Sequence, residues 1–414
     1  MIQPSQFACQ PQMSPPHHLQ FALIALALAV SASAWAEGAD DLRLRASESF
    51  FHDSNLFRLP SGANALALIG RSSTAETINT AAIGLNYNKA YSLQRVEFDL
   101  SYTDYRYRNF SYLDFGAVNY RGAWRWSYTP HLHGNLTTSR DETLNSFADF
   151  QGFNLRNVRV DANTRADAEY ELDANWRLGG GLSQYSRKNA QPLVQEGDFR
   201  NVSADAGVRY VLASGSSVGY SFRSTEGTNT NRSLPSPGFF DNSFTQIDND
   251  LKLNWAISPD TSAEFRAGHR SRKNPNYPQR NFSGSTGAAN LSWAITGKSA
   301  VVAGWTRELG AYETSNSNFV RTDRISVGPI LQVSPKSSVR VQLDHAALDY
   351  LGAPGAVFTP QRRDHTRDTS VSFDWQPFTY LALSASLQNS RRSSNLPGLD
   401  YASNMVNLSA QFTY

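Results

Sequence analysis

The stretch Val-Arg-Val-Asp-Ala-Asn-Thr-Arg-Ala-Asp-Ala-Glu-Tyr, residues 158–170, places a charged or amide side chain at every second position. Successive side chains of a β-strand point to opposite faces, so the stretch predicts a strand with one apolar and one polar face. The same alternation recurs at 95–102, 339–344 and 406–414, whereas helical periodicity is almost absent from Glu37 onward. An all-β chain is predicted, although a soluble antiparallel sheet gives the same alternation.

The connections between the alternating runs follow a repeat of about 40 residues. Each repeat has an aromatic or apolar residue, any residue and an apolar residue, and then a tight turn. Longer polar segments rich in Gly, Asn, Ser and Pro lie between the tight turns, at 187–197, 227–242, 274–284, 310–318, 351–364 and 391–399. Seven clear copies and one weaker copy begin at Trp126, Tyr170, Tyr210, Trp255, Trp293, Leu331, Trp375 and, most weakly, Tyr87.

A repeat of this length also suits a propeller, which would need four short strands in each repeat. Here each repeat holds only two runs of about 10–15 residues, long enough for a tilted strand to cross a bilayer. Aromatic residues beside short turns, with long loops at the other end, are typical of an outer-membrane barrel. Eight short turns predict a transmembrane antiparallel up-and-down β-barrel of 18 strands, or 16 without the weakest turn, and barrels of that size enclose an aqueous channel.

The polar face of the runs is rich in arginine and carboxylates. Such charges in lipid would cost about 2–4 kcal/mol each near the midplane, so they are predicted to face the lumen. They form either a wall of ion pairs that holds the barrel open or a track that contacts a polar solute. The predicted pore-lining residues are Arg95, Asp99, Arg121, Arg125, Arg159, Asp161, Arg165, Asp167, Asp205, Arg209, Asp248, Asp250, Arg266, Arg270, Arg272, Arg340, Asp344, Asp368 and Asp374.

A second set of arginines is expected where the upward strands leave the membrane. Contacts with lipopolysaccharide phosphates are the first explanation for these side chains, and substrate capture is the second. The set comprises Arg140, Arg187, Arg223, Arg307, Arg391 and Arg392. Nearby aromatic residues are expected either to stack on sugar rings or to form an interface girdle: Tyr105, Tyr107, Phe110, Tyr112 and Phe115.

Composition narrows the function classes. Hydrophobic residues make up 40% of the 414 residues and charged residues 18%, both below the usual shares of a soluble globular chain. A net charge of +2 argues against a nucleic-acid protein. The run 215–219 matches G-x-S-x-G but falls in a predicted hairpin, where no nucleophile elbow can form. We therefore expect no enzyme activity, no metal and no cofactor.

The N-terminal segment predicts export. Residues 19–36 form a short apolar stretch that ends in Ala34-Trp35-Ala36, which is typical of a secretory signal peptide cleaved before Glu37. Residues 1–36 are therefore predicted as signal peptide and 37–414 as the barrel domain. No Lys or Arg precedes the apolar stretch, so either Met1 or Met13 is the start. The single cysteine, Cys9, lies in this segment, so the predicted mature chain has no disulfide.

Several motifs resemble those of a known family. The segments Phe50–Leu59, Tyr112–Tyr120, Trp124–Trp126, Gly134–Arg140 and Leu144–Phe147 look like the outer-membrane barrel protein encoded in exopolysaccharide biosynthesis operons of exosortase-bearing bacteria, within the broad class of β-barrel porins. The resemblance implies passive export of a polysaccharide through the outer membrane of a Gram-negative bacterium. It carries over no catalytic residues.

Two alternatives to polysaccharide export stay open, a general uptake porin for small polar solutes and a structural or enzymatic barrel. The expected partners are outer-membrane lipids and lipopolysaccharide, a polysaccharide chain, and periplasmic or inner-membrane export proteins. The terminal aromatic residue Tyr414 fits the signal that barrel-assembly machinery is thought to recognise.

Overall fold

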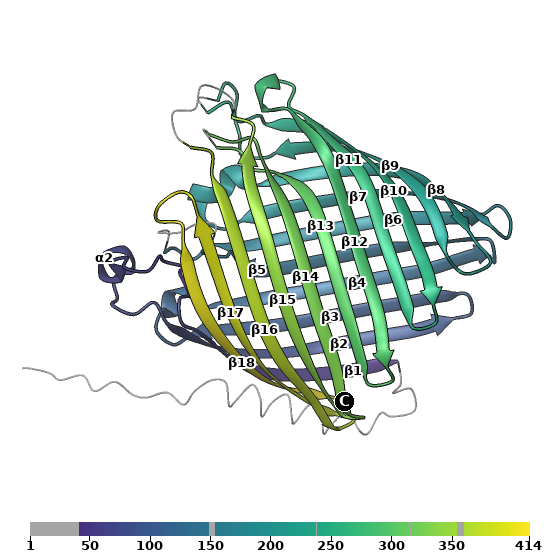
Figure 1. Cartoon of the computed structure of the whole chain (residues 1–414), viewed down its shortest axis with the longest axis horizontal. Coiled ribbons are helices and arrows are strands. Elements are labelled where there is room, and N and C mark those ends of the chain that lie inside the picture. Colours follow the sequence, from purple (N-terminus) through teal and green to yellow (C-terminus); the bar gives the residue numbers. More distant parts are fainter. Residues whose placement is uncertain (1–40, 149–153, 237, 315, 354–359) are drawn as a thin grey trace, which may run out of the picture.

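The chain folds into a single closed sheet of 18 antiparallel strands (Figure 1). A computed structural model describes residues 41–148, 154–236, 238–314, 316–353 and 360–414. The predicted signal peptide, residues 1–36, lies outside the described residues. The strands are β1 (Leu42–Asp53), β2 (Glu76–Tyr91), β3 (Gln94–Tyr107), β4 (Phe115–Thr129), β5 (Leu132–Leu144), β6 (Val158–Glu171), β7 (Trp176–Asn189), β8 (Phe199–Val211), β9 (Ser217–Asn229), β10 (Ser243–Ser258), β11 (Thr261–Lys273), β12 (Phe282–Thr296), β13 (Ser299–Ala311), β14 (Phe319–Ser334), β15 (Ser337–Leu351), β16 (Arg363–Phe378), β17 (Leu381–Ser394) and β18 (Tyr401–Thr413).

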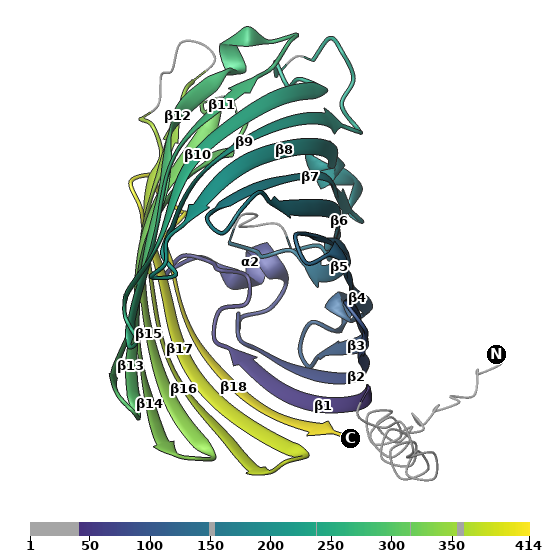
Figure 2. The ribbon, with the colours of Figure 1, turned by 90° about the vertical axis from the view of Figure 1, so that its right-hand side faces the viewer.

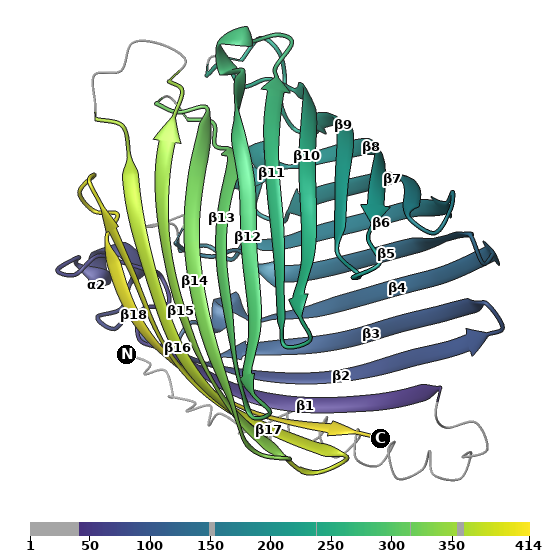
Figure 3. The same ribbon diagram turned by 45° about the vertical axis from the view of Figure 1, so that its right-hand side comes forward.

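The predicted fold class and strand number are confirmed. Each strand pairs with its sequence neighbour, and β1 also pairs with β18, from Arg45↔Thr413 to Asp53↔Met405. Figure 3 shows β1 beside the C-terminal end of the chain at this seam. Reciprocal backbone hydrogen bonds between Leu44 and Tyr414, at 2.7 and 2.8 Å, complete the seam. Closure matters because it removes the unpaired edges that would otherwise leave backbone groups without partners in lipid.

Short and long connections lie at opposite ends of the barrel. Eight tight turns join β2 to β3, β4 to β5 and so on to β17, at the same end as the start of β1 and the end of β18. The weakest predicted turn, near Tyr87, is present between Tyr91 and Gln94, which decides for 18 strands over 16. The longer loops at the other end contain one short helix, α2 (Ala65–Ile69), and the 3-10 turns η2 (Ser111–Leu113), η3 (Pro192–Gly197) and η4 (Pro278–Arg280). Within the described residues, no helix is both long and apolar enough to span a membrane.

The wall has two chemically different faces. Residues paired in register across an antiparallel sheet share a face, so the registers assign every strand residue to one side. One side, here called the apolar face, carries most of the exposed large apolar residues, for example Phe98, Trp255, Phe373 and Leu408. The opposite side is the polar face, and it carries the charged residues described below.

The hydrophobic core lies at the long-loop end. Phe57, Phe110 and Phe147 come from the β1–β2, β3–β4 and β5–β6 loops, with ring centroids 4.8 Å (Phe57–Phe110) and 4.6 Å (Phe57–Phe147) apart. They pack against Ile78 and Tyr107, which lie on the polar face of β2 and β3. Each buried ring contributes about 1.5–3 kcal/mol. In Figure 2, which looks along the barrel, α2 and its loop fall within the outline of the ring of strands, and Figure 1 shows them beyond the strand ends, so they lie at the long-loop mouth.

Candidate solute path along the polar face

All nineteen predicted pore-lining residues lie on the polar face, as their registers show. Fifteen of them lie within 4.0 Å of an oppositely charged side chain. Their role as the lining of a pore remains a prediction. The other four have no such ion pair among the described residues: Arg272, Arg340, Asp368 and Asp374.

The ion pairs reach across intervening strands. Arg165 on β6 contacts Asp205 on β8, with Nη1–Oδ1 at 2.6 Å and Nη2–Oδ2 at 3.0 Å. The pair crosses β7 at Gly181, where an added Cβ would lie 2.6 Å from Nη2 of Arg165. Arg45 on β1 contacts Asp99 on β3 at 3.2 Å in the same way, above Gly84 of β2. Because glycine has no side chain, the middle strand leaves room for the guanidinium to pass over it to the carboxylate on the next strand.

Other parts of the wall also pair arginines with carboxylates. Arg209 of β8 contacts Glu169 of β6 at 2.6 Å, and Arg270 of β11 contacts Asp248 of β10 at 2.6 Å. Arg266 of β11 bonds both Asp250 of β10 and Glu308 of β13. Sequence reasoning missed further members on the same face, although their strand parity could have found them: Arg45, Glu97, Asp141, Glu308 and Arg324.

A groove on β2–β6 holds the most exposed member of this network. It has a volume of about 460 Å³, and its lining includes Asn86, Asp99, Arg121, Asp141 and Asn163. The Arg121 side chain is 75% exposed, and its single contact with Asp141 is 3.5 Å long. A pair this exposed contributes little stability, so its partners can exchange.

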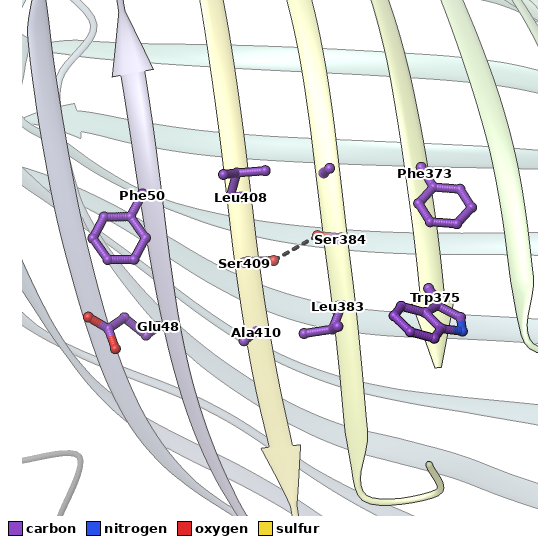
Figure 4. Close-up of a pocket in the computed structure, with 10 residues that line it drawn as sticks. Glu48, Phe50, Phe373, Trp375, Leu383, Ser384, Leu408, Ser409 and Ala410 are labelled. Atoms are coloured by element: carbon purple, nitrogen blue, oxygen red, sulfur yellow. Dashed lines mark hydrogen bonds between the residues drawn. The ribbon is translucent and has the colours of Figure 1, made fainter. Parts of the chain in front are cut away.

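A second depression lies over the β1–β18 seam and has a different character. It measures about 390 Å³, and Figure 4 shows Phe50, Trp375 and Leu408 around it, with the Glu48 carboxylate at its border. These four residues belong to the apolar face by register, so the depression lies mainly on the side opposite the ion pairs. It is therefore separate from the polar path.

A loop spans part of the barrel mouth at the long-loop end. Arg392 of β17, which is buried, donates from Nη1 to the carbonyl of Ala148 in the β5–β6 loop at 2.8 Å. Five strands, β18 and β1 to β4, separate β17 from β5 around the wall. Asn154, farther along this loop, bonds the carbonyl of Leu68 in α2 at 3.3 Å. The β5–β6 and β1–β2 loops together therefore narrow the mouth.

The loops on the opposite side are tied together by one arginine. Arg280, at the end of η4, is 1% exposed and donates to carbonyls of the β9–β10 and β13–β14 loops, including Gly238 at 2.6 Å and Thr314 at 2.6 Å. Burial lowers the pKa of Arg280 from its ordinary value. Arg232 and Glu313, 2.5 Å apart, join the same two loops. The described residues of these three loops, β9–β10, β11–β12 and β13–β14, therefore pack together as a loop layer.

The structure corrects two expectations about the rim. Arg140, Arg307 and Arg391 lie on the apolar face, where contact with lipopolysaccharide stays a prediction, but Arg187, Arg223 and Arg392 lie on the polar face, where the first two pair with carboxylates. Of the rim aromatics, Tyr107 and Phe110 are buried in the hydrophobic core, and Tyr105 and Phe115 pack against it, stacked at 4.5 Å. These four rings form neither a girdle nor a free sugar platform. Strand parity places Tyr105, Tyr107 and Phe115 on the polar face, and Phe110 lies in the β3–β4 loop that packs over them.

Within the described part of the chain, no group of three or more His, Cys, Asp or Glu side chains could hold a metal ion.

Comparison with known proteins adds to the fold. No protein-family model matches the chain, and no curated protein sequence does either. Among solved structures, OpdK of Pseudomonas aeruginosa with vanillate is similar at a TM-score of 0.51 and 10% identity, over 91% of this chain and 99% of that chain. OccK2 (OpdF) from the same organism, in complex with glucuronate, has a TM-score of 0.51 and 11% identity, over 90% and 96%. At this identity the similarity shows the shared barrel fold.

Proposed function

We propose that the chain is a passive outer-membrane channel that admits small polar solutes. The observation that carries this proposal is the continuous polar face of a closed 18-stranded barrel. If the apolar face contacts lipid, the polar face must line the lumen, and barrels of this size enclose water. The location in the outer membrane follows from the same two-faced wall, with the short turns toward the periplasm.

Uptake is favoured over polysaccharide export. Two of the similar structures hold vanillate and glucuronate, both small molecules with a carboxylate, and none of them supports an export role. In this chain the loop bridge from Ala148 to Arg392 narrows the mouth, which suits small solutes better than a polymer. An operon link to exopolysaccharide synthesis remains a prediction of the sequence resemblance.

The groove around Arg121 gives the proposal a mechanism. A guanidinium binds a carboxylate through two parallel hydrogen bonds, and Arg121 is exposed with only a weak partner in Asp141. A passing carboxylate can take the place of Asp141 without leaving a buried charge unpaired. The amides of Asn86 and Asn163 in the same groove offer further hydrogen bonds to hydroxyl groups.

Channel activity is tested by incorporating the full mature chain into planar bilayers. Stepwise ion conductance is expected, and a folded barrel that never conducts would refute the proposal. Liposome swelling then compares glucuronate with glucose. Arg121→Gln should slow glucuronate more than glucose, whereas Arg307→Gln on the apolar face serves as control and should change neither rate.

The direction of transport needs a separate comparison. Uptake through a narrowed mouth predicts that long neutral glucans swell liposomes far more slowly than glucose. Equal rates for polymer and monosaccharide would contradict the uptake proposal. In cells, deletion should leave the amount of secreted polysaccharide unchanged and slow growth on small carboxylates.

A further inference from the structure

The apolar face carries arginines at the long-loop end, and most of them are neutralised by the barrel itself. Arg307 contacts Asp323 at 2.7 Å, and Arg321 contacts Asp349 at 2.6 Å. Two further pairs on this face are Arg106–Asp104 at 2.7 Å and Arg140–Glu142 at 3.0 Å. An arginine near lipid is therefore usually matched by a carboxylate on the same face.

Arg367 and Arg391 break this rule. They are direct register partners on β16 and β17, and both are exposed. No carboxylate of the described residues lies within 4.0 Å of either guanidinium. Like charges directly opposite each other on a sheet are destabilising, so an anion from outside the chain that binds both guanidinium groups would relieve their repulsion.

Two histidines lie beside these arginines on the same face and complete the patch. His345 on β15 is the register partner of Arg367, so His345, Arg367 and Arg391 form a row across three neighbouring strands. His365 stacks on His345 with ring centroids 5.8 Å apart and planes 7° from parallel. At about 4.8 Å between strands, the row spans roughly 10 Å, wide enough for more than one contact with a phosphorylated headgroup.

The patch lies at the border of the apolar surface. On β16 the apolar residues Val371, Phe373 and Trp375 follow Arg367 toward the short turns, and on β17 Leu387 lies four residues from Arg391 in the same direction. The guanidinium groups therefore lie just beyond the lipid-facing band, on the long-loop side. This is the depth of the outer-leaflet headgroups in an outer-membrane barrel.

From this geometry we propose that His345, His365, Arg367 and Arg391 bind the phosphates of lipid A, the phosphorylated lipid of the outer leaflet. Guanidinium groups bind phosphate in bidentate fashion, and the adjoining apolar strands receive the acyl chains. Asp349, the nearest carboxylate on this face of β15, is already held by Arg321 at 2.6 Å and Arg363 at 3.6 Å. The proposal rests on the outer-membrane location and is independent of what passes through the lumen.

The test measures binding of lipid A to the purified full-length mature barrel in detergent by native mass spectrometry. The double variant Arg367→Gln/Arg391→Gln should bind at least tenfold more weakly than the parent. The control Arg307→Gln/Asp323→Asn, which removes a neutral pair from the same face, should stay within twofold. If the double variant does not fold, Arg391→Gln alone decides, with an expected loss of at least threefold.

Two further probes identify the source of the phosphate. Dephosphorylated lipid A should bind the parent as weakly as lipid A binds the double variant, and inorganic phosphate at equal concentration should not displace lipid A. Equal binding of lipid A to parent and variant, equal binding of dephosphorylated lipid A, or displacement by inorganic phosphate would each overturn the proposal. A barrel that binds lipid A but does not conduct would refute only the channel.

Discussion

The Arg165–Asp205 pair should be energetically coupled far more strongly than the Arg121–Asp141 pair of the same wall. Arg165 makes two short hydrogen bonds, and its side chain and that of Asp205 are 27% and 15% exposed. Arg121 makes one contact of 3.5 Å, with the two side chains 75% and 45% exposed. We expect a coupling free energy of about 1.5–3 kcal/mol for the first pair and less than about 1 kcal/mol for the second.

A double-mutant cycle measures each coupling. The variants Arg165→Gln, Asp205→Asn and their combination are unfolded with urea in lipid vesicles, and the same is done for Arg121→Gln and Asp141→Asn. Each single variant also disturbs a second contact, since Arg223 lies 3.4 Å from Asp205 and Asp167 lies 3.3 Å from Arg165, so only the full cycle isolates the coupling within the pair. Equal couplings for the two pairs would show that exposure and bond geometry do not decide the strength of this wall.

Glycine substitutions on β7 test whether the Arg165–Asp205 ion pair depends on the space above Gly181. A Cβ at position 181 would lie 2.6 Å from Nη2 of Arg165, so Gly181→Ala should push the guanidinium off β7 and lose up to the full coupling energy. That cost should largely disappear in the Arg165→Gln background. Gly179→Ala is the matched control on the same strand and face, since its nearest neighbour would be an ordinary 3.7 Å away. A similar cost for both alanines, in either background, would refute the argument.

Three further predictions concern the mouth, the loop layer and the seam. Arg392→Gln should release the Ala148 loop and raise single-channel conductance, and it should also destabilise the barrel by about 1–3 kcal/mol because buried Arg392 donates to the Leu399 carbonyl at 2.7 Å as well; unchanged conductance would show that the loop does not limit flow. Arg280→Met should expose the β9–β10 and β13–β14 loops to protease within minutes while the strands stay protected, and equal loop cleavage in both proteins would contradict the anchoring role. Glu48→Leu should stabilise the barrel against urea by about 1–2 kcal/mol, because an exposed carboxylate on the apolar face loses its hydration in lipid. A less stable variant would show that Glu48 contacts water and not lipid.

The sequence was sufficient to predict the wall, because a strand places its side chains by parity. Alternation alone assigned all nineteen charged residues to one face, and the weak turn near Tyr87 was enough to count 18 strands. Arg187, Arg223 and Arg392 were misplaced because the rim arginines were grouped by their height on the strands and the parity rule was not applied to them. Counting from the apolar residues of each strand would have separated them from Arg140 and Arg391.

The loop layer could not be predicted in the same way. It depends on contacts between residues far apart in sequence, such as Arg392 with Ala148, and on one arginine, Arg280, that is satisfied mainly by backbone carbonyls. Carbonyl acceptors leave no trace in the sequence. The glycines that let Arg165 and Arg45 cross a strand are visible, but their meaning appears only once the neighbouring strands are known.

Selectivity in the proposed channel should therefore reside more at the mouth than along the wall. Most wall charges are already neutralised by a partner, so a solute that binds there must compete with an ion pair such as Arg165–Asp205. Weak pairs like Arg121–Asp141 are the places where exchange costs little. If so, exchanging loop residues should change which solutes pass. Neutralising a partly buried wall pair should mainly lower the stability of the barrel, and permeation should change only as a result of that loss of stability.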